Sequence, residues 1–369
     1  MSEAPEESSE GVDLPQPLLD QATPNDPPIA RDSARRARIA QDLDAELVER
    51  LQAFEDVMDS EVGDTALTRA RNIERTYGIR QLFLKFEGGN PTGTQKDRIA
   101  FAQVRDAMRR GYDAITVATC GNYGAAMGLA ASLAGMRCVV YVPGNWHPRR
   151  VAEMLSTGVE LERIEGDYEE AVRLSTLRAE EDDLYDANPG GSNTALQLQA
   201  YGQIAAEIYD ELRDAPAIVA VPVSNGTTVA GIYRGFLSLY RRGKTSRIPR
   251  IVGGSSYRKN PIVHAFRRGK PTVQDLDPKR IHETRINEPL INWHSIDGDQ
   301  ALESIRSSSG FAADATDRTM IALARRVREK EGLSILPASA AGLAALLAHH
   351  ERTPLPGDRY VAVLTGRRA

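Results

Sequence analysis

The sequence predicts an α/β protein of two lobes, each a mostly parallel, twisted sheet wrapped by helices. Three observations support this fold class. The chain has 369 residues, which is more than a single hydrophobic core usually organises. Short runs rich in β-branched residues alternate with amphipathic helical patterns, such as EEAVRLSTLRAEE and RTMIALARRVREKEG. Glycine-rich polar turns follow several of these runs, at the position where open parallel sheets bind their ligands.

The expected elements follow one another in order along the chain. Residues 1–38 are rich in Pro, Ser, Asp and Glu, and we expect them to form a disordered tail. A helix is predicted from Ile39 onward, with one apolar stripe that should dock on a neighbouring lobe. The stripe consists of Ile39, Leu43, Leu47, Leu51, Phe54 and Met58. Strands are predicted at residues 81–86, 114–119, 137–142, 159–164, 217–223, 250–255 and 360–365. Residues 256–315 lack clear periodicity, and no element is assigned to them.

Composition excludes several classes of function. The formal net charge is -5, which argues against a basic nucleic-acid-binding surface. The apolar runs are far shorter than the roughly 20 residues that span a bilayer, so we expect no membrane insertion. The chain has two cysteines, no CxxC motif and scattered histidines, and we expect neither a metal site nor secretion. A cytoplasmic location fits these features best.

Three strand ends carry polar turns that open helices. The first, GGNPTGTQKDR, delivers Lys96 to the start of a helix, where the helix dipole disfavours an ammonium group. Lys96 is therefore either a surface lysine or an amine of lowered pKa that can form a Schiff base. The second turn, TCGNYG, and the third, SNGTT, combine small residues with a helix start, which suits a bound anion. Each turn alone is weak evidence, because a glycine-rich turn is often a plain connection.

Taken together and in order, these motifs resemble a known family. NPTGTQKDR, TCGNYG, PVSNGTTVAG, PASAAGLAAL and VAVLTG are similar to the threonine synthase branch of the pyridoxal-phosphate enzymes of the tryptophan synthase β fold. The resemblance runs from about Asp64 to the C-terminus and includes the segment TRINEPLINWHSIDGDQ, which periodicity did not explain. It implies a pyridoxal 5'-phosphate cofactor bound between the two lobes.

The resemblance also assigns roles to individual residues. It implies that Lys96 forms the Schiff base, that Asn122 lies beside the pyridoxal 3'-oxygen and that Thr365 meets the pyridine nitrogen. A neutral hydroxyl at that nitrogen favours elimination and replacement over transamination. The cofactor phosphate is expected to bind to Ser224, Asn225, Gly226, Thr227 and Thr228. The substrate is expected to contact Thr119, Cys120, Gly121, Tyr123, Gly124 and Arg150.

Some residues depart from the pattern of the family. Leu336 stands where a glutamate is usual, and Tyr123 stands where most relatives have threonine, so that its phenol is expected to project toward the substrate. The stretch after Asn188 and Pro189 lacks the arginine that meets the substrate phosphate, a contact for which Arg149 or Arg150 is a candidate. The remaining departures are a chain that ends soon after the TG dipeptide and a turn less rich in glycine.

Three functions stay open at this level. The first is a threonine synthase acting on O-phosphohomoserine. The second is a paralogue that acts on serine, threonine or O-phosphoserine, and the third is a non-catalytic cofactor-binding regulator. We expect residues 39–98 and 188–369 to form a large cofactor-binding domain and residues 99–187 to form a small substrate-side domain. The resemblance further implies a homodimer with a small amino acid as its substrate.

Overall fold

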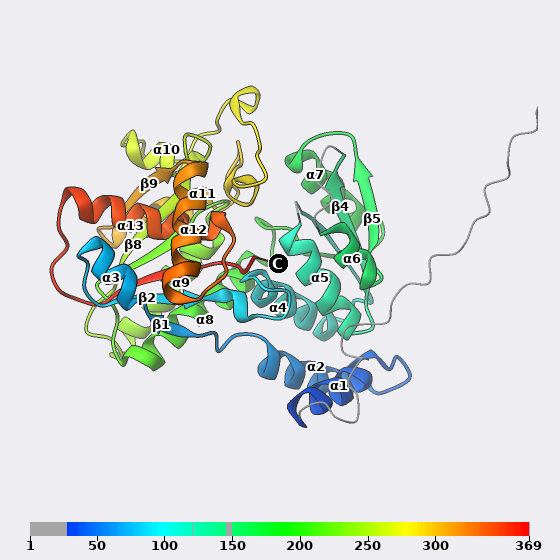
Figure 1. Cartoon of the computed structure of the whole chain (residues 1–369). Helices are drawn as coiled ribbons and strands as arrows, with labels where there is room; N and C mark the ends of the chain where they lie inside the picture. The colour runs from blue at the N-terminus through cyan, green and yellow to red at the C-terminus, as the bar shows by residue number, and fades with distance from the viewer. Residues whose placement is uncertain (1–27, 120, 145–149, 369) are drawn as a thin grey trace, which may run out of the picture.

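The computed structural model describes residues 28–119, 121–144 and 150–368, which form two lobes with one sheet each (Figure 1). The six-stranded sheet of the larger lobe has the order β1-β2-β10-β7-β8-β9. Only β1 is antiparallel to its neighbour in this sheet. Its strands are β1 (Leu67–Arg69), β2 (Leu82–Phe86), β7 (Ile218–Pro222), β8 (Arg250–Ser256), β9 (Phe311–Ala315) and β10 (Tyr360–Leu364). The predicted fold class is confirmed.

The smaller lobe contains a four-stranded sheet of the order β5-β4-β3-β6, in which all pairs are parallel. Its strands are β3 (Ala114–Ala118), β4 (Arg137–Pro143), β5 (Glu160–Ile164) and β6 (Tyr185–Asp186). All seven strands predicted from the sequence are present in the two sheets. The strands that the sequence did not reveal are β1, β6 and β9, of which the first two are very short.

Helices cover both faces of the larger sheet. Residues of β7 alternate between two hydrophobic clusters, because successive side chains of a strand point to opposite faces. Val219 and Val221 pack with the cluster of α8 and α9, whereas Ile218 and Ala220 pack with that of α12 and α13. The helices of this lobe are α3 (Arg71–Tyr77), α8 (Thr194–Leu212), α9 (Thr227–Arg241), α10 (Pro261–Arg267), α11 (Gly298–Ser307), α12 (Asp317–Glu331) and α13 (Ala341–Arg352). Short 3-10 turns lie at Glu87–Gly89 (η2), Pro278–Arg280 (η3), Glu288–Leu290 (η4) and Pro337–Ala340 (η5).

The remaining helices build the smaller lobe and the connection below it. They are α4 (Lys96–Arg109), α5 (Asn122–Leu133), α6 (Val151–Ser156), α7 (Tyr168–Glu181), α1 (Pro28–Gln41) and α2 (Leu47–Glu61). In Figure 1, α4 lies between the two lobes, and α1 with α2 lies beneath the smaller one. Within the described residues, no helix is both long and apolar enough to cross a membrane.

The N-terminal region differs from the expectation in two ways. Helix α1 begins at Pro28, so residues 28–38 of the predicted tail are helical, and residues 1–27 lie outside the described part. Ala34, Ala37 and Ala40 are buried at a spacing of three, which gives α1 a small packing face. The amino-acid composition of residues 1–38 did not indicate this face.

The predicted single helix from Ile39 is wrong, because α1 ends at Gln41 and α2 begins only at Leu47. The side chain of Asp42 accepts a hydrogen bond from the backbone amide of Asp44 at 3.1 Å, a local contact that competes with helix formation. Leu43 is consequently 67% exposed and does not join the stripe. The expected docking on a neighbouring lobe is confirmed, since Phe54 of α2 stacks on Phe101 of α4 at 5.6 Å between ring centroids.

Candidate active site

A cavity of about 260 Å³ lies where both lobes meet, at the carboxyl ends of β3, β7 and β10. Ala118 and Pro222 end β3 and β7, Thr365 follows β10, and all three line the cavity. This is the edge at which parallel sheets bind ligands. The predicted site residues that line it are Lys96, Thr119, Gly121, Asn122, Tyr123, Ser224, Asn225, Gly226, Thr227, Thr228 and Thr365. Cys120 and Arg149 lie outside the described residues.

Lys96 opens α4 and points into this cavity. Removal from water lowers the pKa of its amine to about 8, although the nearby carboxylate of Asp297 acts in the opposite direction. The Lys96 Nζ atom lies 5.2 Å from the centroid of the Tyr123 ring. A sizeable fraction of neutral amine is therefore present near neutral pH, which a nucleophilic role requires.

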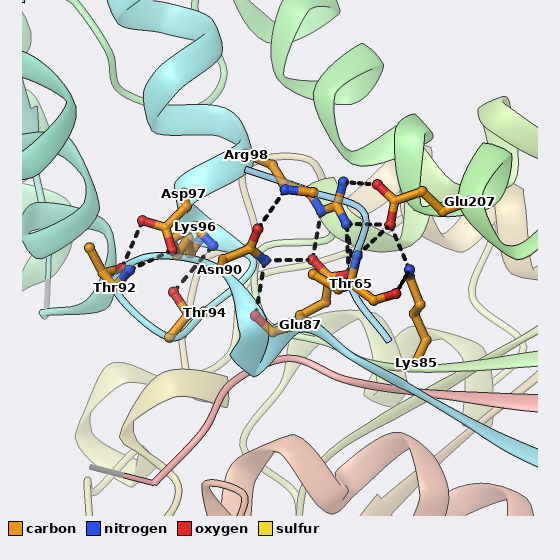
Figure 2. Close-up of polar contacts among 11 residues, drawn as sticks. Thr65, Lys85, Glu87, Asn90, Thr92, Thr94, Lys96, Asp97, Arg98 and Glu207 are labelled. Carbon is orange, nitrogen blue, oxygen red and sulfur yellow. Dashed lines mark hydrogen bonds and ion pairs between the residues drawn. The ribbon is translucent and has the colours of Figure 1, made fainter. Parts of the chain in front are cut away.

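The loop before Lys96 is held by hydrogen bonds among its own side chains and that of Asp97, the next residue of α4. Asp97 is fully buried and accepts hydrogen bonds from the backbone amide and the hydroxyl of Thr92, at 3.1 and 2.8 Å. Burial raises the pKa of Asp97 to about 7, and the bonds from Thr92 oppose that rise. The hydroxyl of Thr94 accepts a bond from the Lys96 amide at 3.2 Å (Figure 2).

Beneath this loop lies a buried network of ion pairs that the sequence did not reveal (Figure 2). Arg98 binds Glu87 through two contacts of 2.6 and 2.9 Å and binds Glu207 through two of 2.6 and 2.8 Å. Lys85 Nζ lies 2.5 Å from the second oxygen of Glu207. These residues come from α4, η2, α8 and β2, so the network fastens the first turn of α4 to three other elements.

The turn of residues 224–228 opens helix α9. Gly226 has φ of +104°, and a Cβ atom there would lie 2.7 Å from the carbonyl oxygen of Asp297 and 2.8 Å from Cβ of Ala301. The position therefore requires glycine. The hydroxyl of Thr227 donates to Asp297 Oδ2 at 2.5 Å. No side chain caps the start of α9, so the backbone amides of its first turn can donate to an anion.

Asn122 opens α5 on the opposite wall of the cavity. Its side-chain oxygen accepts a hydrogen bond from Arg150 Nη1 at 2.8 Å, which directs the amide nitrogen elsewhere. The same guanidinium donates to the carbonyl of Thr92 at 2.8 Å and pairs with Glu153. Arg150 does not line the cavity; it ties Asn122 to the loop before Lys96.

Two further substrate candidates differ from their expected placement. The expected projection of the Tyr123 phenol into the pocket is wrong: its hydroxyl accepts a bond from Gln103 and donates to the carbonyl of Ala187 at 2.9 Å. Only the Tyr123 ring contributes to the wall. Gly124 is not among the lining residues, and a Cβ there would meet Met154 and Thr119, so it serves packing.

Thr365 has a partner that the sequence analysis did not single out. Its hydroxyl lies 3.1 Å from that of Ser339, and both residues line the cavity. The Thr365 carbonyl accepts a bond from the Gln95 amide at 3.0 Å, which fixes the end of β10 beside Lys96. The PASAA motif contained Ser339, but no sequence signal indicated that it would face Thr365.

The outer part of the cavity is acidic. Asp167, Glu169, Glu283 and Glu288 line it, and Lys96 is the only cationic side chain among its described lining residues. Burial raises the pKa of Glu169 to about 7. Asp167 accepts a hydrogen bond from the indole nitrogen of Trp293 at 3.0 Å, which joins the two lobes at the rim.

These features define a class of protein. An amine of lowered pKa, a turn at a helix start that requires glycine at position 226 and a pair of hydroxyls suit a cofactor that carries an aldehyde, a phosphate and a ring nitrogen. The fold and site are those of a cofactor-dependent enzyme with its cofactor between two α/β lobes.

The family follows from comparison with known proteins. Residues 58–366 match the model of the family described as pyridoxal-phosphate dependent enzyme, and the chain belongs to this family. It is 31% identical to a threonine synthase of Methanocaldococcus jannaschii over 309 residues, which cover 82% of this chain and 74% of that one. It is also 31% identical to a threonine synthase of a Bacillus species over 306 residues, which cover 82% of each chain.

Solved structures have the same fold. Maize serine racemase superposes with a TM-score of 0.72 at 18% identity, over 86% of this chain and 92% of that one. A processed threonine deaminase of Solanum lycopersicum superposes with a TM-score of 0.70 at 16% identity, over 87% and 90%. The protein is thus a pyridoxal-phosphate-dependent enzyme, as the sequence predicted.

Proposed function

We propose that this enzyme is a threonine synthase, which converts O-phosphohomoserine and water into threonine and phosphate. The observation that carries the proposal is the meeting of Lys96, the Gly226 turn and Thr365 in one cavity. The curated relatives at 30–31% identity support the choice of reaction, because they are named threonine synthases.

Within this proposal, Lys96 would hold the cofactor covalently through its amine. The turn of Ser224, Asn225, Gly226, Thr227 and Thr228 holds the cofactor phosphate, since first-turn amides of α9 are free to donate. Asn122 would contact the pyridoxal 3'-oxygen and Thr365 the pyridine nitrogen, as the family resemblance implies. The bound cofactor supplies an electron sink for the α-carbon of an amino acid.

The other residues position the substrate and move protons. Thr119 and Gly121 line the wall at which the family resemblance places the substrate carboxylate, beside the ring of Tyr123. Their backbone amides donate to the carbonyl of Tyr141 and to the Thr119 hydroxyl, so substrate binding would have to exchange these contacts. The Lys96 amine, with its pKa of about 8, can accept and return a proton at the substrate carbon. Arg150 acts through Asn122 and the loop of Thr92, because its guanidinium is already engaged there.

The proposal extends to organisation. Residues 39–98 and 188–369 form the cofactor-binding domain, and residues 99–187 form the substrate-side domain, a division supported by the separate six-stranded and four-stranded sheets. The protein is a cytoplasmic homodimer in this proposal, on the strength of its family resemblance and its low cysteine content.

One observation favours the second candidate, the paralogue, and in particular its form that acts on serine or threonine, which carry no phosphate. The acidic residues Asp167, Glu169, Glu283 and Glu288 line the cavity, and the only described cation there is Lys96. Carboxylates repel a phosphate dianion, so O-phosphohomoserine should bind weakly. Serine and threonine would meet weaker repulsion, because they carry no phosphate dianion.

A substrate panel tests these alternatives. Purified holoenzyme is incubated with O-phosphohomoserine, O-phosphoserine, serine or threonine, while phosphate, ammonia and new amino acids are measured separately. Equal release of phosphate and threonine from O-phosphohomoserine supports the threonine synthase. Ammonia from serine or threonine instead replaces it with the paralogue. Turnover of none of them, with cofactor bound, leaves the non-catalytic regulator. Lys96→Ala is the control that must abolish any turnover.

A further inference from the structure

A second cavity, of about 620 Å³, lies in the larger lobe outside the proposed active site. It is formed where β8 ends, around α10 and beside η3. Its volume is typical of sites for small metabolites. In Figure 1 the yellow segment that contains η3 runs between α10 and the smaller lobe.

Positive charge dominates the lining of this second cavity. It contains four arginines and two aspartates, which leaves an excess of two positive charges; the arginines are Arg258, Arg267, Arg268 and Arg280. Arg267 pairs with Asp314 at 2.5 Å, and Arg280 pairs with Asp277 at 3.3 Å. Arg258 and Arg268 have no carboxylate partner among the described residues.

Three more features make the cavity suitable for a ligand. Ser256 is 1% exposed and lines the cavity at the carboxyl end of β8, where parallel sheets bind ligands. Arg258 has a positive φ of +58°, a conformation that non-glycine residues adopt rarely and that often marks functional turns. Val263, Leu276 and Ile281 add an apolar wall for the organic part of a ligand.

Two residues of the second cavity, Ile281 and Asn260, link it to the proposed active site. Ile281 lines both cavities, so the segment around η3 forms a shared wall. Asn260 lines the second cavity and donates hydrogen bonds to the carbonyl of Ser224 at 3.0 Å and to Asn292 Oδ1 at 3.1 Å. Ser224 and Asn292 in turn line the active-site cavity.

We propose that the second cavity binds a small organic phosphate and that its occupation changes the active site through Ile281 and Asn260. Guanidinium groups recognise phosphate through paired, charge-assisted hydrogen bonds, and Arg258 and Arg268 are available for such bonds. The site concerns a ligand other than the substrate, so the inference does not depend on which amino acid the enzyme converts.

Calorimetric titration of the holoenzyme with phenyl phosphate tests the binding. The bound cofactor occupies its own phosphate turn, which removes that turn as a competing site. The wild type and the double variant Arg258→Gln, Arg268→Gln are compared with the control Arg241→Gln, Arg242→Gln, whose arginines lie on α9 and just after it and do not line the cavity. Both altered pairs are exposed, so folding should be retained.

We expect binding to the wild type and the control, and at least about tenfold weaker binding to the double variant. Saturation should also shift the visible absorption of the cofactor in the wild type but not in the double variant. Equal affinity of the wild type and the double variant, or no binding to the wild type at millimolar concentration, would overturn the site. Binding without any spectral change would overturn the coupling.

Discussion

Replacing Arg98 with methionine should destabilise the protein strongly, because it leaves a fully buried carboxylate, Glu87, and a partly buried one, Glu207, without their main partner. Glu87 is fully buried and would keep hydrogen bonds only to Thr65 and Asn90. Among the residues that the structure describes, Glu207 would keep Lys85 as its one ionic partner. Methionine fills part of the volume of the arginine and supplies no charge.

The magnitude can be worked out in two ways. Breaking a buried ion pair by removing one partner costs about 3 to 5 kcal/mol. Burial alone would raise the pKa of Glu207, but the bonds from Arg98 and Lys85 lower it to about 2 from an ordinary value of 4.5. That difference corresponds to about 3 kcal/mol for Arg98 and Lys85 together, so the loss of Arg98 alone removes a part of it from Glu207. We therefore expect the Arg98→Met variant to lose about 3 kcal/mol of unfolding free energy at pH 7.

The sign of the pH dependence provides a sharper check. The folded pKa of Glu207 is depressed, so its stabilisation is complete above about pH 4.5 and is lost as the pH falls toward about 2. The free-energy difference between wild type and Arg98→Met should therefore narrow as the pH falls below about 4.5.

Urea unfolding of the apoprotein, followed by circular dichroism from pH 7 down to about pH 2.5, measures both effects. Arg173→Met is the matched control, because Arg173 forms an exposed pair with Glu170 on α7 and should leave the midpoint unchanged. If Arg98→Met behaved like this control, or if its cost did not vary with pH, the network would not have the role assigned to it.

Three further predictions concern the active site. The rate of covalent attachment of pyridoxal phosphate to the apoenzyme should rise with pH through a midpoint near pH 8. Borohydride reduction with peptide mapping should place the cofactor on Lys96. Modification of another lysine would refute the assignment. Gly226→Ala should weaken cofactor retention after dialysis by about tenfold, because a side chain at this position is strained and has no space. The control Gly243→Ala, with φ of +68° and open surroundings, should leave cofactor retention unchanged. Arg150→Ala should raise the KM for the substrate by about tenfold and shift the cofactor spectrum, because it frees Asn122; an unchanged spectrum would contradict this role.

The fold could largely be predicted because buried parallel strands have a strong pattern. The strands β7 and β10, IVAVP and YVAVL, are fully buried and rich in β-branched residues. Strand β9 has the sequence FAADA, whose alanines and aspartate indicate no strand, and it forms because β8 provides its partner. The break between α1 and α2 depended on one side-chain contact of Asp42, which a periodicity of apolar residues does not detect.

The inner part of the site could be predicted from the sequence, whereas the outer part could not. Lys96 and the Gly226 turn follow strands, so the rule that ligands bind at strand ends located them. Glu283, Glu288 and Trp293 come from the segment without periodicity between η3 and α11, and only the folded chain brings them to the rim. The engaged guanidinium of Arg150 also depends on tertiary contacts, so its availability for a substrate could not be judged from its position in the sequence.

The first turn of α4 explains why a cation stands at a helix start. Successive helical residues are about 100° apart, so positions 96 and 98 face nearly opposite directions. Burial tends to lower the pKa of Arg98, but Glu87 and Glu207 raise it above its ordinary value, which keeps this side chain charged as an anchor. Lys96 has no such pairing, and its pKa falls. One turn thus carries a permanently charged residue that fixes the helix and an amine that can lose its proton, and the rigidity of the first determines how accurately the second is presented to the cofactor.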